Sequence, residues 1–374
     1  MRSPSAAATA AAGALLVGAL IALNAQAGAA AEHRLDGFNV IAAPGDPFGG
    51  VAAKSSLADA ERLGARAIAV VPFFWQSDPA SPDLVRGKDM SDGELRAAIR
   101  EAHALGLAVL VKPHVWVPRS WAGAVAMKSA TDWRLWFANY RKALDRVARI
   151  AEEEKAEALA IGTELSRTTQ RPEWDELIAN IRGIYSGRLL YVAHNVGGAE
   201  KVPFWNRLDA IGVTLYPPLG ADDDRAGRLA IMRMVADRLD ALFARTGKPI
   251  IVAEVGLRSA RGAAAEPWQS PEQRAGAPDP SLQARVLADW LSVLDRPSIR
   301  GVLIWYWLTN PNAGGLNDTD FTVQGKPAEP VLMCAWKRDC DQDQAGARTP
   351  RPLKTVARSR TPSHSPAAHC GRHR

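Results

Sequence analysis

The feature that most constrains the fold of this chain is a strict alternation of short apolar runs with stretches of helical periodicity. Each run is only a few residues long and is bounded by Gly, Pro or polar residues, which is the pattern of a buried strand. Eight such runs lie at 37–42, 67–75, 108–114, 159–164, 189–195, 209–216, 249–256 and 301–307. Eight strand–helix units in succession predict an α/β protein, a parallel sheet closed into a single (β/α)8 TIM barrel.

Composition divides the 374-residue chain into three parts. Residues 1–31 combine Arg2, an apolar segment and small residues around Ala27, which predicts a cleaved secretory signal peptide and therefore export to the periplasm or beyond. An uncleaved N-terminal membrane anchor is the alternative; after cleavage no stable membrane insertion is expected. Residues 32–336 form the predicted catalytic domain. Residues 337–374 are a basic, Pro- and Ser-rich tail predicted to be disordered.

The charge of the chain indicates little about nucleic acid. The formal net charge is +6, yet residues 337–374 alone hold nine Lys or Arg against three acids, so the domain is close to neutral. We therefore expect no nucleic-acid partner and a monomer. Three cysteines, Cys334, Cys340 and Cys370, all lie late in the chain, and the first two are close enough in sequence for a disulfide in an oxidising compartment. Neither a metal nor a cofactor is expected.

Two of the apolar runs end in a glutamate, Glu164 and Glu254. The active site of a (β/α)8 barrel forms at the C-terminal ends of its strands. A pair of carboxylates there fits cleavage of a glycosidic bond, in which one group protonates the leaving oxygen and the other attacks the anomeric carbon or activates water. Their separation, about 5–5.5 Å for retention or about 6.5–9.5 Å for inversion, is not readable from sequence. The alternative is a pair of rim ion-pair partners.

Other strand ends carry polar and aromatic side chains, in a chain with twelve Trp and only five Tyr. Aromatic rings stack on the apolar face of a sugar, and Asn, Lys and His hydrogen-bond its hydroxyls. The expected substrate-binding residues are Lys112, His114, Trp116, Asn195, Tyr216, Trp305 and Trp307. Most of them also have a structural alternative: Trp305 and Trp307 as core residues, Lys112 as a partner of a carboxylate, His114 as a partner of a neighbouring loop, Asn195 as a turn residue and Tyr216 as a packing residue.

Several of these segments resemble glycoside hydrolase family 113. The similar residues are Ile161-Gly162-Thr163-Glu164-Leu165, then Trp174, Leu177, Ile178, Arg182, Tyr185 and Gly187, the segment 191–195, Glu254-Val255-Gly256 and Trp305-Tyr306-Trp307. The resemblance implies a retaining glycosidase with Glu164 as acid/base, Glu254 as nucleophile and β-mannan as substrate. One position departs from the wider clan: Thr163 stands where an Asn usually contacts the 2-hydroxyl of the substrate.

The sequence thus predicts an exported, retaining β-glycoside hydrolase that acts on an oligo- or polysaccharide, with mannan favoured by the resemblance. One alternative keeps the chemistry and changes the substrate to another β-glycan or an exopolysaccharide. A second is a catalytically silent barrel that binds glycans through its Trp-rich cleft. Endo and exo action both remain open, and the loop at 259–280 is a candidate for setting the number of subsites.

Overall fold

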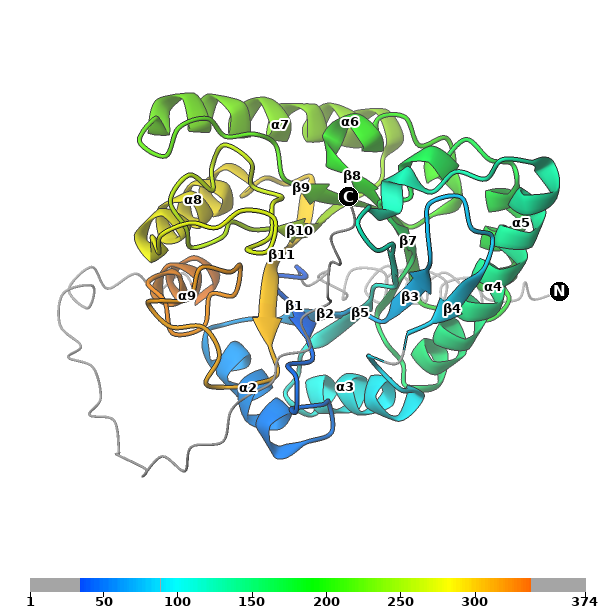
Figure 1. The fold of residues 1–374 in the computed structure, drawn as a ribbon, viewed down its shortest axis with the longest axis horizontal. Helices are drawn as coiled ribbons and strands as arrows, with labels where there is room; N and C mark the ends of the chain where they lie inside the picture. Colours follow the sequence, from blue (N-terminus) through cyan, green and yellow to red (C-terminus); the bar gives the residue numbers. More distant parts are fainter. Residues whose placement is uncertain (1–33, 88, 338–374) are drawn as a thin grey trace, which may run out of the picture. The chain divides into compact units, whose positions relative to one another are not determined.

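The computed structural model describes residues 34–87 and 89–337, and in this part of the chain eight strands form a closed parallel barrel (Figure 1). The predicted (β/α)8 fold is therefore confirmed. In barrel order the strands are β1 (Gly37–Ile41), β11 (Ile299–Leu308), β10 (Ile250–Val255), β9 (Ala210–Leu215), β8 (Arg188–His194), β7 (Ala158–Thr163), β5 (Ala108–Val111) and β2 (Ala67–Val70).

Helices surround the barrel and connect its strands (Figure 1). They are α2 (Val51–Arg62), α3 (Asp92–Ala104), α4 (Ala130–Glu153), α5 (Glu173–Arg182), α6 (Asn195–Ala199), α7 (Arg225–Thr246), α8 (Pro280–Val293) and α9 (Ala328–Lys337). Local sequence sets several of their starts. Ser91 and Glu94 form a capping box at the start of α3, and the Ser129 hydroxyl caps α4.

Two of the predicted runs are broken by proline. Pro72 ends the second barrel strand, so the residues beyond it form a separate strand, β3 (Phe73–Gln76); Pro113 likewise separates β5 from β6 (His114–Trp116). With β4 (Leu84–Arg86), these extensions make a three-stranded sheet in the order β4-β3-β6. Proline lacks the N–H that continues a strand ladder, which explains why each run splits at that residue.

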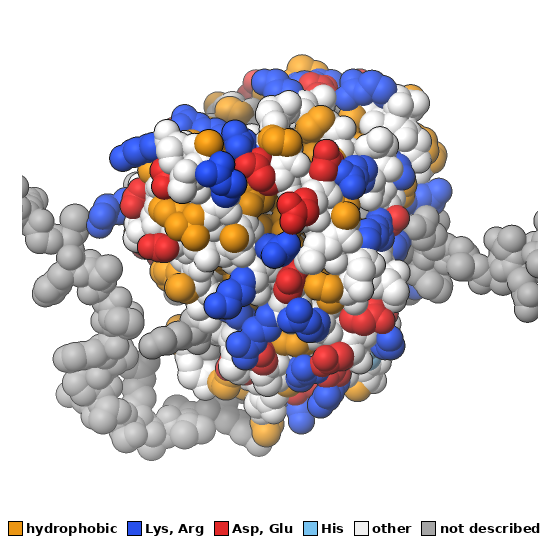
Figure 2. Space-filling view, turned by 90° about the vertical axis from the view of Figure 1, so that its right-hand side faces the viewer, with side chains coloured by type: hydrophobic (Ala, Val, Ile, Leu, Met, Phe, Trp, Pro, Cys, Tyr) orange, Lys and Arg blue, Asp and Glu red, His pale blue; other side chains and the backbone are white. Residues whose placement is uncertain are grey.

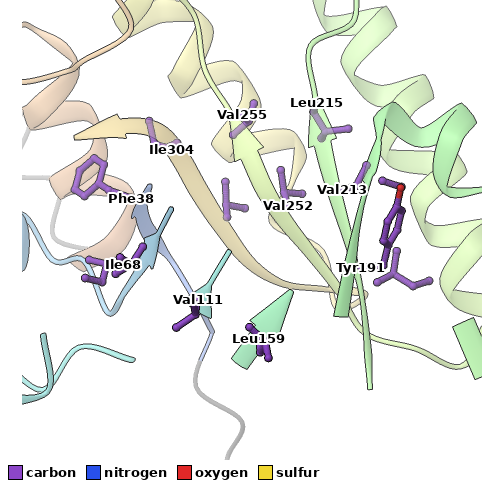
Figure 3. Packing of buried hydrophobic residues seen from close by; sticks show 14 of the residues in the cluster. Phe38, Ile68, Val111, Leu159, Tyr191, Val213, Leu215, Val252, Val255 and Ile304 are labelled. Carbon is purple, nitrogen blue, oxygen red and sulfur yellow. The ribbon is translucent and has the colours of Figure 1, made fainter. Parts of the chain in front are cut away.

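The core has two layers that follow the alternation along the strands. The barrel interior is filled by small side chains, among them Ala69, Ala160 and Ala253, together with a few larger ones such as Leu110 and Leu303. The opposite face of each strand packs against the helices with larger residues, and Figure 3 shows ten labelled examples from Phe38 to Ile304. Burial of this apolar surface is the main favourable contribution to folding.

The long segment 259–279 between β10 and α8 is held at several points. Asp222, at the start of the turn before α7, accepts hydrogen bonds from the backbone N–H groups of Gly262 (2.6 Å) and Ala264 (3.4 Å). The buried Arg258 guanidinium donates to the carbonyls of Ser270 (3.0 Å) and Arg274 (2.7 Å). These bonds fix the segment against the rest of the domain. The acidic turn at 222–224 is therefore partly structural.

The surface in Figure 2 carries Lys or Arg and Asp or Glu side by side. Among the described helices, none is long and apolar enough to span a membrane. Cys334 is disulfide-bonded, whereas Cys340 and Cys370 lie outside the described residues. The predicted signal peptide (1–31) and the tail beyond residue 337 also lie outside them.

Candidate active site

Both glutamates lie at the C-terminal end of the barrel, Glu254 within β10 and Glu164 directly after β7, the seventh and fourth barrel strands in chain order. A register shift precedes each. In β7, Ala160 pairs with Leu190 and Thr163 with Val192, so three steps along β7 match two along β8. In β10, Val252 pairs with Val213 and Glu254 with Thr214. Such bulges insert an extra residue and re-aim the side chain that follows.

Glu254 is almost fully buried and has two donors. The Lys112 ammonium, whose side chain is 0% exposed, binds its Oε1, and the Tyr216 hydroxyl lies 3.4 Å from its Oε2. The Lys112 ammonium also lies 5.2 Å from the ring centroid of Trp305, within cation–π range. Burial and the charge of Glu254 raise the pKa of Tyr216 well above its usual value, so its hydroxyl remains a donor.

The Glu164 carboxyl accepts hydrogen bonds from side chains of β8 and β9. Its Oε1 accepts from Thr214 Oγ1 (2.6 Å) and His194 Nδ1 (2.8 Å), and its Oε2 faces His114 Nε2 at 3.8 Å. Burial acts to raise the pKa of this carboxyl, but the nearby imidazoles of His114 and His194 outweigh burial and lower it. For His194 burial acts to lower the pKa, and the carboxylate of Glu164 outweighs it and raises the pKa.

The two glutamates face one site. His194 on β8 and Thr214 on β9 are register partners, and Thr214 is in turn the partner of Glu254 on β10. The Glu164 side chain therefore extends from β7 across β8 to a residue that lies beside Glu254. At this end of the barrel the arrangement provides a carboxylate paired with an ammonium and a second carboxyl held by neutral donors and imidazoles. The two carboxyls therefore have unlike partners.

Asn195, an expected sugar-binding residue, makes two hydrogen bonds within the protein. Its Oδ1 accepts from the backbone N–H of Tyr216 (3.0 Å) and its Nδ2 lies 3.0 Å from His194 Nε2. Thr163, adjacent to Glu164, is buried, and its hydroxyl donates to the Pro113 carbonyl (2.9 Å). The hydroxyl of Thr163 therefore ties β7 to the end of β5.

An aromatic face extends from the carboxylates along the small sheet. Phe73 pairs with His114 and Trp75 with Trp116 in the β3–β6 register, so these four side chains share one side, while Phe74 and Val115 are buried on the other. Trp75 and Trp116 are 40% and 48% exposed, and their ring centroids lie 6.0 Å apart.

Trp121, 43% exposed, adds a second aromatic surface, with its ring centroid 4.7 Å from that of His194. Neither Phe73 nor Trp121 was among the residues predicted to line the site. Phe73 could have been found, because it lies two residues before Trp75 on the same extended segment and so shares its side. Trp121 follows no strand pattern, and no signal in the sequence pointed to it.

The expectation that Trp305 and Trp307 both contact substrate is corrected for Trp307. Trp307 is buried, donates its indole N–H to Ser56 Oγ (2.7 Å) and packs on Phe38 with ring centroids 4.7 Å apart. A register shift explains the difference: Asn39 of β1 pairs with Trp305, and the next residue, Val40, pairs with Trp307. Adjacent residues of β1 face opposite sides, so the two tryptophans do as well.

Within residues 34–87 and 89–337, no group of three or more His, Cys, Asp or Glu side chains is placed to hold a metal ion.

Comparison with known proteins gives a family match and close structural similarities. The family model of Glycoside Hydrolase Family 113 matches residues 38–326. A β-mannanase of that family from Alicyclobacillus acidocaldarius, solved in complex with ManMIm, superimposes with a TM-score of 0.74 at 25% identity, covering 82% of this chain and 98% of the other. A family 113 β-1,4-mannanase solved as a complex gives 0.73 at 26% identity, covering 82% and 100%.

More distant structures share the fold alone. A β-glucuronidase from Ruminococcus gnavus is 13% identical with a TM-score of 0.56, and the match covers 81% of this chain and 50% of that one. A comparison with curated proteins found no match.

Proposed function

Because the chain belongs to glycoside hydrolase family 113, we propose that it hydrolyses a β-linked glycan with retention of anomeric configuration, with Glu254 as nucleophile and Glu164 as acid/base. The observation that carries this proposal is the placement of the two glutamates at one end of the fourth and seventh barrel strands, joined through Thr214. Their partners differ: Glu254 is paired with the Lys112 ammonium, whereas Glu164 accepts a hydrogen bond from the His194 imidazole.

The proposed reaction has two displacements. In the first, a Glu254 oxygen bonds to the anomeric carbon, the bond from that carbon to the leaving oxygen breaks, and Glu164 gives that oxygen its proton. In the second, Glu164 removes a proton from water, the water oxygen bonds to the anomeric carbon, and the bond to Glu254 breaks. Lys112 and Tyr216 hold the nucleophile in place, and they bind the carboxylate again when it leaves.

The aromatic face of the β3–β6 sheet favours a substrate of several sugars over a single one. Trp75 and Trp116 are exposed and extend away from His114, which itself contacts Glu164, so further sugar units of a bound chain can stack on them. β-Mannan is the favoured polymer because the similar solved enzymes are β-mannanases. The prediction of export also stays part of the proposal, supported by the pattern of residues 1–31, with an uncleaved anchor as its alternative.

The catalytic roles can be tested with Glu254→Ala and Glu164→Ala. Glu176→Ala serves as a matched control, because Glu176 lies on α5 with 80% of its side chain exposed. Hydrolysis of a panel of β-linked oligosaccharides should fall by several orders of magnitude in the first two variants and stay unchanged in the control. Azide should restore turnover of an activated aryl glycoside to Glu164→Ala, which keeps its nucleophile. Near-normal hydrolysis by either site variant would refute the assignment.

Stereochemistry and substrate are separate readouts. Proton NMR of the first product formed should show the β-anomer; an α-anomer would indicate inversion. Hydrolysis of manno-oligosaccharides but not of gluco-oligosaccharides would support mannan. Binding of oligosaccharide without any release of reducing ends would instead support the catalytically silent barrel. Trp116→Ala should raise KM for long chains more than for the shortest substrate, since only a long chain reaches Trp116.

A further inference from the structure

The two oxygens of the Glu164 carboxyl are not equivalent. Its Oε1 accepts hydrogen bonds from both Thr214 Oγ1 and His194 Nδ1, which together occupy the two lone pairs of that oxygen. A proton on Oε1 would have to displace one of these donors. Its Oε2 instead faces His114 Nε2 at 3.8 Å. The oxygen that can carry a transferable proton is therefore Oε2.

This assignment depends on which nitrogen of His194 bears a proton, and Asn195 determines that. A backbone N–H can only donate, so the bond from the Tyr216 N–H fixes the Asn195 oxygen on that side. The amide nitrogen of Asn195 then points at His194 Nε2 and donates to it. Because Nε2 is the acceptor, neutral His194 carries its proton on Nδ1 and donates it to Glu164.

His114 does not compete for Oε1. Its Nδ1 lies 3.1 Å from the Val115 carbonyl, and its Nε2 is 3.8 Å from Glu164 Oε2, beyond hydrogen-bond distance. His194 thus binds Oε1, and Oε2 is left for the transferable proton.

We propose that Asn195 is a positioning residue that holds His194 as the Nδ1–H tautomer, and thereby directs the catalytic proton of Glu164 to Oε2. The proposal rests on the function proposed above for Glu164. Besides Glu164, the Glu254 carboxylate acts on His194, and the Trp121 ring packs on the imidazole. Asn195 opposes protonation of His194, because an amide N–H facing an imidazolium N–H is repulsive.

The tautomer can be observed directly, without any activity assay. Two-bond proton–nitrogen correlation spectra of the 15N-labelled full chain at neutral pH report which imidazole nitrogen bears the proton, with the His194 signals assigned by their loss in His194→Gln. We expect His194 to show a protonated Nδ1 and an unprotonated Nε2. A protonated Nε2, in a neutral or a charged ring, would overturn the proposal, and that result is independent of whether the protein hydrolyses glycans.

Asn195→Asp gives the kinetic test. The new carboxylate keeps an acceptor for the Tyr216 N–H and replaces the donor that faces Nε2 by an acceptor, so His194 either becomes charged or moves its neutral proton to Nε2. A charged ring weakens the proton affinity of Glu164, and the switched tautomer draws the proton onto Oε1. Either outcome impairs proton donation to the leaving group.

General acid catalysis is worth about 10²–10⁴-fold, and we expect Asn195→Asp to lose about tenfold or more of kcat/KM with poor leaving groups. With a dinitrophenyl glycoside, whose leaving group needs no proton, the loss should be several-fold smaller. Asn206→Asp makes the same change at an exposed position before β9, and it should leave kcat/KM unchanged with both substrates. Equal losses on both substrates would assign Asn195 a merely structural role and overturn the proposal.

Discussion

The buried pair of Lys112 and Glu254 allows the sharpest test of how this site is held together. The Lys112 side chain is 0% exposed and that of Glu254 is 7% exposed, so neither charge is stabilised by bulk water. Lys112→Met retains an unbranched apolar side chain of similar length and removes the ammonium. Glu254 would then retain the Tyr216 hydroxyl, at 3.4 Å, as a hydrogen-bond donor. An uncompensated buried carboxylate is the expected result.

Removing one partner of a buried ion pair costs about 3–5 kcal/mol, mostly because the other charge is left unpaired. We expect Lys112→Met to lower the free energy of unfolding by that amount, out of the roughly 5–15 kcal/mol of an ordinary domain. Urea unfolding measures it: the midpoint should fall while the m-value stays unchanged. The variant should remain folded in the absence of denaturant.

A double-mutant cycle separates the charge from the packing. Glu254→Gln removes the carboxylate that Lys112→Met would leave unpaired. The double variant should therefore lose about 2–3 kcal/mol less unfolding free energy than the two single variants lose together. The exposed pair Arg141 and Glu176, 3.3 Å apart, is the control, and Arg141→Met with Glu176→Gln should couple by less than about 1 kcal/mol. If the buried pair were additive to within about 0.5 kcal/mol, the reasoning would be refuted.

Three further predictions concern single residues of the site. Tyr216→Phe should reduce kcat/KM by about tenfold, since a hydrogen bond to a charged group is worth about 1.5–3 kcal/mol; steady-state kinetics measures this, and an unchanged value would contradict the role of the hydroxyl. Thr163→Val should cost about 1–3 kcal/mol of unfolding free energy through the lost bond to the Pro113 carbonyl, with KM unchanged below the melting temperature; a raised KM would instead indicate substrate contact. The pKa of the Glu164 carboxyl is lowered in the folded state. Its contribution to stability is therefore present above the unfolded pKa of 4.5 and is lost as the pH falls through the folded pKa. Glu164→Gln should flatten the acid side of a plot of unfolding free energy against pH, and an unchanged acid slope would argue against the lowered pKa.

The alternation of strand and helix patterns was sufficient to predict the barrel and to place both glutamates at its C-terminal end. It was also sufficient for Lys112 and His114, because residues two apart on an extended segment share a side. The sequence predicted that both face the site. In the structure Lys112 contacts Glu254, and His114 lies near Glu164 despite the break at Pro113.

Alternation could not predict the positions where it fails. Ala253 and Glu254 are consecutive, yet Ala253 lies in the barrel interior and Glu254 binds Lys112 at the C-terminal end of the barrel. Both can do so because β10 holds an extra residue at this point. The shift between Trp305 and Trp307 has the same origin. A bulge depends on how two strands match each other, and that match is not contained in the period of either strand.

The anchored segment 259–279 has a consequence for the thermodynamics of binding. A loop that orders only when substrate arrives subtracts about 1–2 kcal/mol per residue in lost backbone entropy from the binding free energy. Here Asp222 holds Gly262, and Arg258 holds Ser270 and Arg274. A substrate that contacted this segment would therefore bind by nearly rigid association, and the heat capacity change would reflect the surface removed from water rather than coupled folding of the chain.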